Sequence, residues 1–275
     1  MTIPRPGDPQ VLKSCCATAY QSDAVAAILG DSYHPGGLTL TRHLARTLGL
    51  RPGMRVLDVA SGPGTTALAL ATEFGCEVVG VDLGEQNVAR AGHAAEKAAL
   101  ADLVTFHTGD AEQLPFEDGS FDAVVCECAF CTFPDKPTAA RELARVLRPG
   151  GRVGITDITV APGGLPPELT DLAGWVACLA DARPLEQYAD LLAAAGLRTA
   201  LTERHDDALR RMVEQIDARL RVHRMTPTSK TGSLLTGADI DRALALTGQA
   251  AQAVSAGTAG YALLIAEKPK EAPTS

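Results

Sequence analysis

The sequence predicts an α/β protein with a doubly wound, Rossmann-like, mostly parallel sheet, helices on both faces and a helical C-terminal insertion or lid. Between residues 55 and 157, short apolar runs alternate with segments of helical periodicity. This alternation is typical of a parallel sheet, because parallel neighbours need a crossover connection that is usually a helix. A late apolar run, Tyr261–Ala266, predicts one more strand that returns to the sheet.

The elements of the core follow from apolar runs and from the turns between them. The runs predict strands at Arg55–Val59, Glu77–Val81, Val104–His107, Phe121–Cys126 and Arg152–Asp157. Helical periodicity between these runs predicts helices at Thr66–Phe74, Gln86–Ala99 and Lys136–Leu147.

Three parts are expected along the chain. Residues 1–50 form an N-terminal helical cap with helices at Asp23–Leu29 and Thr39–Leu48, and residues 51–160 form the core. Residues 161–275 open with a Pro/Gly-rich linker and form a helical substrate region that contains the returning strand near 261–266. The helices expected in this last part are Leu169–Leu179, Leu185–Ala195, Asp207–Arg221 and Gly237–Ala253.

Composition favours an ordinary globular protein. Of 275 residues, 46% are hydrophobic and 21% are charged, and the formal net charge is −8. An excess of acidic residues without a basic stretch argues against a nucleic-acid partner. There is no apolar run typical of a signal peptide and no segment of about 20 apolar residues that could span a membrane. We therefore expect a cytoplasmic protein that does not associate with membranes.

A glycine loop and three acidic residues follow consecutive predicted strands. The loop is Asp58–Gly64, Asp82 ends the second strand, and Asp110 follows the third. Glycines allow close approach of the backbone to a ligand, and an acid at the end of the second strand can bind the hydroxyls of a ribose. Because strand ends converge on one crevice, these groups are expected to share a site.

These segments resemble the class I methyltransferases that use S-adenosylmethionine. The resemblance lies in VLDVASGPG (56–64), VVGVD (78–82), GDAEQLPFEDGSFDAVVC (109–126) and LRPGGRVGITD (147–157). It implies S-adenosylmethionine as cofactor, with its methionine part near the glycine loop, its ribose on the second acid and its adenine near the third. The cofactor-binding residues it implies are Asp58, Ser61, Gly62, Gly64, Asp82, Leu83, Asp110, Ala111 and Cys126.

The cysteines suggest a methyl acceptor. The chain has 7 cysteines, an odd number, so in a reducing compartment they are expected to be thiols rather than disulfides. Three segments resemble arsenite methyltransferases: Lys13–Cys16, Cys128–Lys136 and Cys178–Tyr188. The resemblance implies that Cys128 and Cys178 bind trivalent arsenic as substrate, with Cys15 or Cys16 assisting, and that a thiol reductant and a role in detoxification accompany the reaction.

The chemistry of this hypothesis is coherent. Soft trivalent arsenic prefers thiolate ligands, and its lone pair can attack the methyl group without a general base. His34, His43 and His107 are accordingly interpreted as structural or surface residues. The sequence departs from the family at Tyr33–Gly37, where a further cysteine is usual, so Cys15, Cys16 or Cys131 has to replace it.

Two alternatives stay open. In the first, the enzyme methylates O, N or C of a small metabolite, the cysteines are packing residues, and Glu127 or His34 removes a proton from the acceptor. In the second, the chain is a non-enzymatic thiol protein that binds a metal at Cys126–Cys131, although structural zinc sites usually have four ligands in two pairs.

Overall fold

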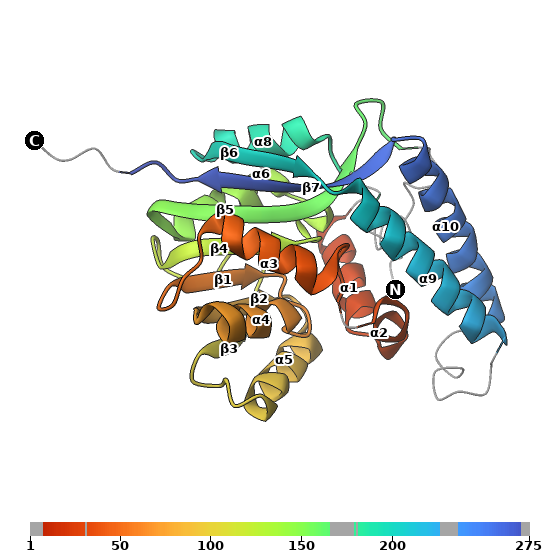
Figure 1. The fold of residues 1–275 in the computed structure, drawn as a ribbon, viewed down its shortest axis with the longest axis horizontal. Helices are drawn as coiled ribbons and strands as arrows, with labels where there is room; N and C mark the ends of the chain where they lie inside the picture. Colours follow the sequence, from red (N-terminus) through yellow and green to blue (C-terminus); the bar gives the residue numbers. More distant parts are fainter. Residues whose placement is uncertain (1–7, 31, 166–178, 180, 226–235, 271–275) are drawn as a thin grey trace, which may run out of the picture.

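A computed structural model describes residues 8–30, 32–165, 179, 181–225 and 236–270, and in this part of the chain one seven-stranded sheet carries helices on both faces (Figure 1). The strand order is β3-β2-β1-β4-β5-β7-β6. β1 to β5 are parallel, and β7 is antiparallel to both of its neighbours. The strands are β1 (Arg55–Val59), β2 (Glu77–Asp82), β3 (Val104–Thr108), β4 (Phe121–Glu127), β5 (Leu147–Val160), β6 (Arg198–Arg204) and β7 (Ala259–Glu267).

The helices lie before, between and after these strands. Before the sheet come α1 (Pro9–Tyr20), α2 (Asp23–Leu29) and α3 (Gly37–Leu48). The crossovers hold α4 (Thr65–Phe74), α5 (Glu85–Lys97), α6 (Lys136–Val146) and the short 3₁₀ helix η1 (Phe130–Thr132). The C-terminal part contains α8 (Leu185–Ala194), α9 (Asp206–Met225) and α10 (Gly237–Ser255).

Local sequence signals fix several helix ends. The side chain of Asp135 accepts a hydrogen bond from the Thr138 N–H at the start of α6, as expected for an N-cap. Thr236 and Asp239 form a reciprocal capping box at the start of α10. α3 ends at Gly49, whose φ of 74° is readily adopted only by glycine.

Alternate residues of the central strands pack on opposite faces of the sheet. On one face, Val56 of β1 belongs to a buried cluster with Leu44 of α3 and Leu70 of α4. On the other face, Leu57 packs in a cluster with Leu143 of α6 and Leu192 of α8. These helices therefore form two layers that bury both faces of the sheet, which explains why its central strands read as nearly continuous apolar runs.

The predicted fold class is confirmed, and the five core strands lie where the apolar runs place them. Two expectations were wrong. The N-terminal cap was expected to hold only the helices at Asp23–Leu29 and Thr39–Leu48, but α1 precedes them. The C-terminal region is not helical up to its returning strand, because β6 precedes β7 and pairs with it at the edge of the sheet. The helix expected at Leu169–Leu179 lies almost wholly outside the described residues.

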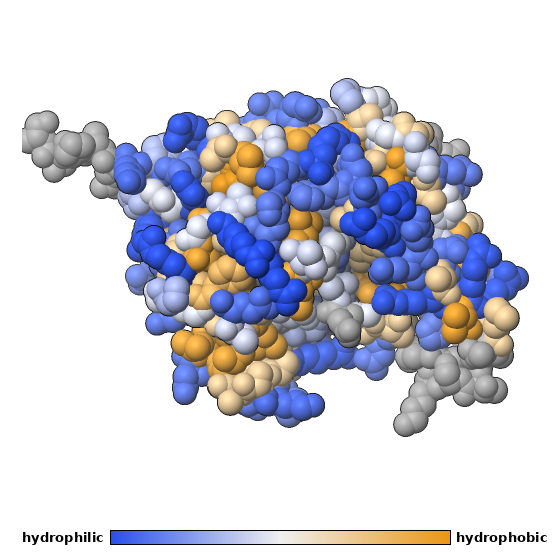
Figure 2. Space-filling view, viewed as in Figure 1, coloured by the Kyte–Doolittle hydropathy of each residue, from blue (hydrophilic) through white to orange (hydrophobic). Residues whose placement is uncertain are grey.

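The outer face of α9 is hydrophilic, as Figure 2 shows. The buried side chains of this helix are Ala208, Leu209, Val213 and Leu220, which recur at helical spacing. No helix in the described part of the chain combines the length and apolarity needed to cross a bilayer.

Candidate active site

A cavity lies at the carboxyl ends of β1 to β4, next to the point where the strand order reverses between β1 and β4. This is where open α/β sheets bind ligands. Its floor comes from the ends of four neighbouring strands, and its roof comes from α1 and the segment before α3. The lining includes Asp58–Pro63, Asp82, Leu83, Gly109–Ala111, Glu127–Ala129, Ser32–His34 and, from α1, Lys13, Cys16, Ala17 and Tyr20.

The carboxylate of Asp58, at the end of β1, is buried, and one of its two oxygens lacks a hydrogen-bond partner among the described residues. Asp58 is 2% exposed, and the oxygen that lacks such a partner is Oδ2. Burial raises the pKa of this carboxyl well above its ordinary range, and the nearby charges of Glu127 and Asp82 raise it further. An unsatisfied buried carboxylate oxygen beside a cavity is costly, so it is poised to accept a hydrogen bond from a cationic ligand.

Asp82, at the end of β2, is held by backbone donors. The N–H groups of Gly62 and Gly84 each donate to one of its carboxylate oxygens at 2.8 Å. Burial raises the pKa of Asp82, although these two hydrogen bonds oppose the shift. Asn87 Nδ2 also donates to Oδ1, at 3.3 Å, whereas Oδ2 accepts only from Gly62 among the described residues and can accept another hydrogen bond. The rigidly placed carboxylate is therefore suited to bind a ligand hydroxyl.

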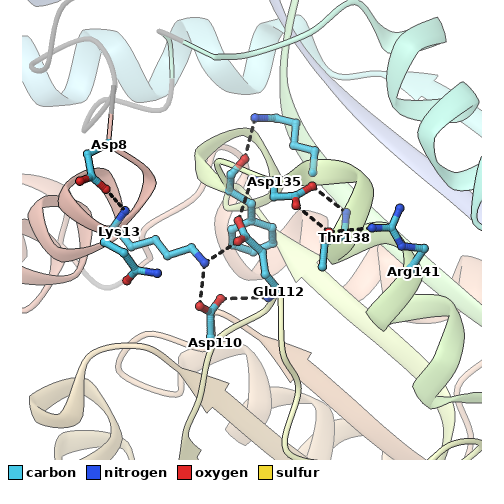
Figure 3. Close-up of polar contacts among 10 residues, drawn as sticks. Asp8, Lys13, Asp110, Glu112, Asp135, Thr138 and Arg141 are labelled. Atoms are coloured by element: carbon cyan, nitrogen blue, oxygen red, sulfur yellow. Dashed lines mark hydrogen bonds and ion pairs between the residues drawn. The ribbon is translucent and has the colours of Figure 1, made fainter. Parts of the chain in front are cut away.

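Asp110 lies under α1 and connects this helix to the cavity. Lys13 of α1 pairs with Asp110 Oδ2 at 2.7 Å and also with Glu112 (Figure 3). Burial lowers the pKa of Lys13, but the hydrogen bonds with Asp110 and Glu112 raise it by more, so the net shift is upward. Glu112 in turn accepts a hydrogen bond from the N–H of Asp135 at 2.7 Å, which ties α1 to the start of α6.

Two non-glycine residues of the lining have left-handed backbones. Ala60, after β1, has φ 59°, and Cys128, after β4, has φ 55°. Such conformations are uncommon for residues with a side chain, and they concentrate at functional sites. Both residues lie where a strand turns sharply away at the edge of the cavity.

Glu127, at the end of β4, is the centre of a buried polar group. Its Oε2 accepts hydrogen bonds from Thr41 Oγ1 at 2.9 Å and from Thr66 Oγ1 at 2.7 Å. His34 Nε2 lies 3.4 Å from the same oxygen, and the two side chains are 7% and 4% exposed. Glu127 Oε1 has no hydrogen-bond partner among the described residues, although Glu127 lines the cavity. The carboxylate is therefore fixed through one oxygen and has the other available for a ligand.

The predicted cofactor residues divide between the cavity and the core. Asp58, Ser61, Gly62, Asp82, Leu83, Asp110 and Ala111 line the cavity. Gly64 and Cys126 are not among the described residues that line it. A Cβ on Gly64 would lie 2.7 Å from the ring of Phe106, so this glycine allows α4 to approach β3. Cys126 is completely buried, and burial raises the pKa of its thiol well above the ordinary value, so it is a packing residue rather than a ligand.

The described cysteines fall into two groups, those that line the cavity and those that do not. Cys16 and Cys128 line the cavity, whereas Cys15 is not among the described lining residues and Cys131 is 1% exposed. Cys178 lies outside the described residues. None of the six described cysteines is in a disulfide. Among the described residues, no cysteine belongs to a group of three side chains arranged for a metal ion, so the zinc alternative at Cys126–Cys131 gains no support.

Sequence reasoning missed several polar residues that complete the site. These residues are Lys13, Thr41 and Thr66, which come from three different helices. Their hydrogen-bond partners lie at least 61 residues away in the sequence, the smallest separation being that of Thr66 and Glu127. No local signal marks such pairs. His34 was interpreted as structural, or at most as an alternative base, and lies beside Glu127 in the cavity wall.

Comparisons with known proteins agree with this architecture. Residues 57–155 match the family described as "Methyltransferase domain". A 27-O-demethylrifamycin SV methyltransferase of Amycolatopsis mediterranei is 42% identical over 45% of this chain and 45% of its own length. The chain spans about half the length of the first curated relatives it matches, with 45%, 33% and 61% of three of them aligned.

Solved structures extend the similarity to nearly the whole chain. The [4+2]-cyclase SpnF has a TM-score of 0.77 and 26% identity over 98% of both chains. The phosphoethanolamine N-methyltransferase 2 of Haemonchus contortus, solved with S-adenosyl-L-methionine, has a TM-score of 0.79 and 24% identity over 94% of this chain and 60% of its own. Residues 57–155 therefore match a methyltransferase domain, for which S-adenosylmethionine is the expected cofactor.

The cavity fits this cofactor chemically. S-adenosylmethionine carries a sulfonium and an ammonium group, and the lining offers four carboxylates, Asp58, Asp82, Asp110 and Glu127, against one lysine, Lys13. The unsatisfied oxygen of Asp58 and the doubly anchored carboxylate of Asp82 are suited to its ammonium group and to its ribose hydroxyls, respectively.

Proposed function

We propose that this chain, through its methyltransferase domain, transfers the methyl group of S-adenosylmethionine to an oxygen of a small organic acceptor, with Glu127 as the proton acceptor. The observation that carries the proposal is the buried Glu127 carboxylate, which two threonine hydroxyls fix through Oε2 while Oε1 lacks a partner among the described residues. A hydroxyl acceptor needs such a base, because its oxygen loses a proton as it is methylated.

The chain's own residues would hold the cofactor by charge and by hydrogen bonds. Asp82 would bind the ribose, the glycine loop at Ser61 and Gly62 would lie along the methionine part together with Asp58, and Asp110 and Ala111 would border the adenine. When bound, S-adenosylmethionine supplies an electrophilic methyl group and a thioether leaving group.

Proton transfer is the part of the reaction that the protein performs. As the acceptor oxygen forms its new bond to carbon, its proton passes to Glu127 Oε1. Thr41 and Thr66 keep the carboxylate in one orientation throughout. His34 Nε2, 3.4 Å from Oε2, can stabilise the carboxylate when this nitrogen carries a proton. The site lowers the barrier to transfer by holding the acceptor oxygen close to both the methyl group and the base.

An organic acceptor is supported by the character of the cavity wall. Tyr20, Tyr33 and Phe133 line the cavity together with the polar groups described above. Small-molecule sites in proteins are mostly apolar and aromatic, with a few placed polar groups. The rifamycin-type relative is named for an organic O-methylation, and this is the acceptor class we propose for the present chain.

Thiolate-bound trivalent arsenic is a second candidate acceptor, because Cys16 of α1 and Cys128 after β4 line the same cavity. In that reaction the two thiolates bind the substrate and Glu127 is not needed. The roles of Cys178, outside the described residues, and of Cys15, away from the cavity lining, remain predictions.

A single assay separates the two candidates. Protein and S-adenosylmethionine are incubated in parallel with a panel of phenols and macrocyclic alcohols, and with arsenite plus glutathione, and release of S-adenosylhomocysteine is measured. The proposal predicts release with a hydroxyl compound, a loss of about 100-fold or more in Glu127→Gln, and little change in Cys16→Ser and Cys128→Ser. Release only with arsenite, abolished by the cysteine variants and retained in Glu127→Gln, would establish the arsenic reaction instead.

A further inference from the structure

A second cluster of chemically active side chains lies where α3 meets β6, and none of its three members is among the described residues that line the cofactor cavity. His43 of α3, Glu203 of β6 and His205, between β6 and α9, bring their side-chain ligand atoms within 4.8 Å of one another. His43 Nε2 is 2.6 Å from Glu203 Oε2, and His205 Nε2 is 3.3 Å from the same oxygen. The three side chains are 44%, 32% and 26% exposed, so ions in solution can reach them.

All three residues come from firmly placed backbone. His43 lies within α3, one residue before the buried Leu44. Glu203 is in register with Leu263 of β7, and the N–H of His205 donates to the Tyr261 carbonyl at 2.7 Å. Ligands on rigid elements lose little freedom when they bind an ion, so such sites are more precise than sites on loops.

We propose that His43, Glu203 and His205 form a binding site for one divalent transition-metal ion, such as zinc. This ion links α3 to the edge strand β6 and the residue that follows it. Two imidazoles and a carboxylate are a ligand set that zinc commonly uses, with a solvent molecule in the fourth position. Magnesium and calcium are poor candidates, because they prefer sets made only of oxygen ligands.

The ligand atoms lie within about 1.4 Å of the separations that such an ion requires. Ligands about 2.1 Å from a tetrahedral ion are separated from one another by about 3.4 Å. The His205–Glu203 separation, 3.3 Å, already meets this value, and the His43–Glu203 separation of 2.6 Å has to open by less than about 1 Å. The ligand nitrogens of His43 and His205 lie within 4.8 Å of each other, so they have to approach by at most about 1.4 Å.

The surrounding charges set the conditions for binding. The three ligands line an open groove of about 870 Å³ between α3 and α9, which also contains His34, Arg46, Arg211 and Arg219. Arg46 and Arg211 are exposed, so solvent and salt screen their charges. Arg219 donates to the carbonyls of Ile28 and Leu29 and is directed to the end of α2. Screening, and the contact of Arg219 with α2, therefore weaken the repulsion that these arginines exert on a cation.

Metal binding can be measured independently of any methyl transfer. Reduced protein, freed of metal by a chelator, is titrated with zinc against a chromophoric competitor and with cobalt in the visible range. We expect one tightly bound ion per chain, and a cobalt spectrum of tetrahedral nitrogen and oxygen ligation without a thiolate charge-transfer band. His43→Gln and His205→Gln should each weaken zinc binding by about 100-fold or more, whereas His93→Gln, on an exposed side chain of α5, should change it less than about twofold.

Glu203→Gln is the additional variant, because its amide oxygen preserves the hydrogen bonds to both histidines while removing the charge. It should also weaken zinc binding, with unchanged circular dichroism. The proposal is overturned if the wild-type protein binds no zinc at micromolar concentrations. It is equally overturned if the ion remains bound in His43→Gln and His205→Gln, or if cobalt reports thiolate ligation. Binding of S-adenosylmethionine should be the same in these variants as in the wild type, so failure here leaves the proposed function unaffected.

Discussion

Replacing Lys13 with methionine tests how α1 is held over the cofactor cavity. Lys13 pairs with Asp110 and Glu112, and the three side chains are 11%, 30% and 12% exposed. No residue of α1 is fully buried, so polar contacts contribute much of its attachment. A hydrogen bond between charged groups contributes about 1.5–3 kcal/mol, and partial exposure reduces this towards ~1 kcal/mol. We therefore expect a loss of about 1–2 kcal/mol in docking of α1, which increases its open fraction by roughly 5- to 30-fold.

Hydrogen exchange of the α1 amides measures this opening directly, because their exchange follows the population of the open state. The affinity for S-adenosylmethionine, measured by calorimetry, should fall as well, because Cys16, Ala17 and Tyr20 of α1 line the cavity. Lys97→Met is the matched control, since Lys97 is exposed on α5. If Lys13→Met leaves both the exchange of α1 and the cofactor affinity within twofold of the wild type, these ion pairs do not hold the helix.

Three further predictions concern the loop and the acids. Gly64→Ala should lower the free energy of unfolding by about 2–4 kcal/mol in urea titrations, because its Cβ would meet Phe106 at 2.7 Å and its φ is +84°. Its control is Gly92→Ala on α5, where an added Cβ would meet nothing within 4 Å, so this variant should gain about 0.5–1 kcal/mol instead. Asp82→Asn should weaken binding of S-adenosylmethionine by about tenfold or more in calorimetry, and retention of wild-type affinity would exclude Asp82 from the ribose site. Burial raises the pKa of Asp58, and a cationic ligand favours its ionised form, so binding of the cofactor should release protons. The affinity for the cofactor should therefore weaken as the pH falls towards that raised pKa. A binding enthalpy, measured by calorimetry, that does not depend on the ionisation heat of the buffer would contradict this.

Much of the fold could be predicted, because its core strands are buried on both faces and their apolar runs are unambiguous. β4, for example, is buried at every position up to Cys126. β6 was missed for the opposite reason. It is an edge strand whose residues, Arg198–Arg204, are exposed or half-buried, so its apolar pattern is weak. Its strand conformation depends on pairing with β7, which the sequence of β6 alone does not indicate.

The site was predictable only where its residues follow strands. Asp58, Asp82 and Asp110 could be placed together, because the ends of parallel strands share one edge of the sheet. The contact of His34 with Glu127 depends on how the segment before α3 folds across the sheet, and nothing local encodes that path. The meeting of His43 with Glu203, 160 residues apart, depends on an edge strand that the sequence did not reveal.

The most direct test of the proposed function compares Glu127→Gln with the wild type in methyl transfer to a hydroxyl acceptor under single-turnover conditions. Glutamine keeps the shape of the side chain and can still accept from Thr41 and Thr66, but it cannot take up a proton. The proposal predicts that the affinity for S-adenosylmethionine stays within about threefold, while the rate of transfer falls by about 100-fold or more. A variant that transfers the methyl group at the wild-type rate would show that Glu127 is not the proton acceptor.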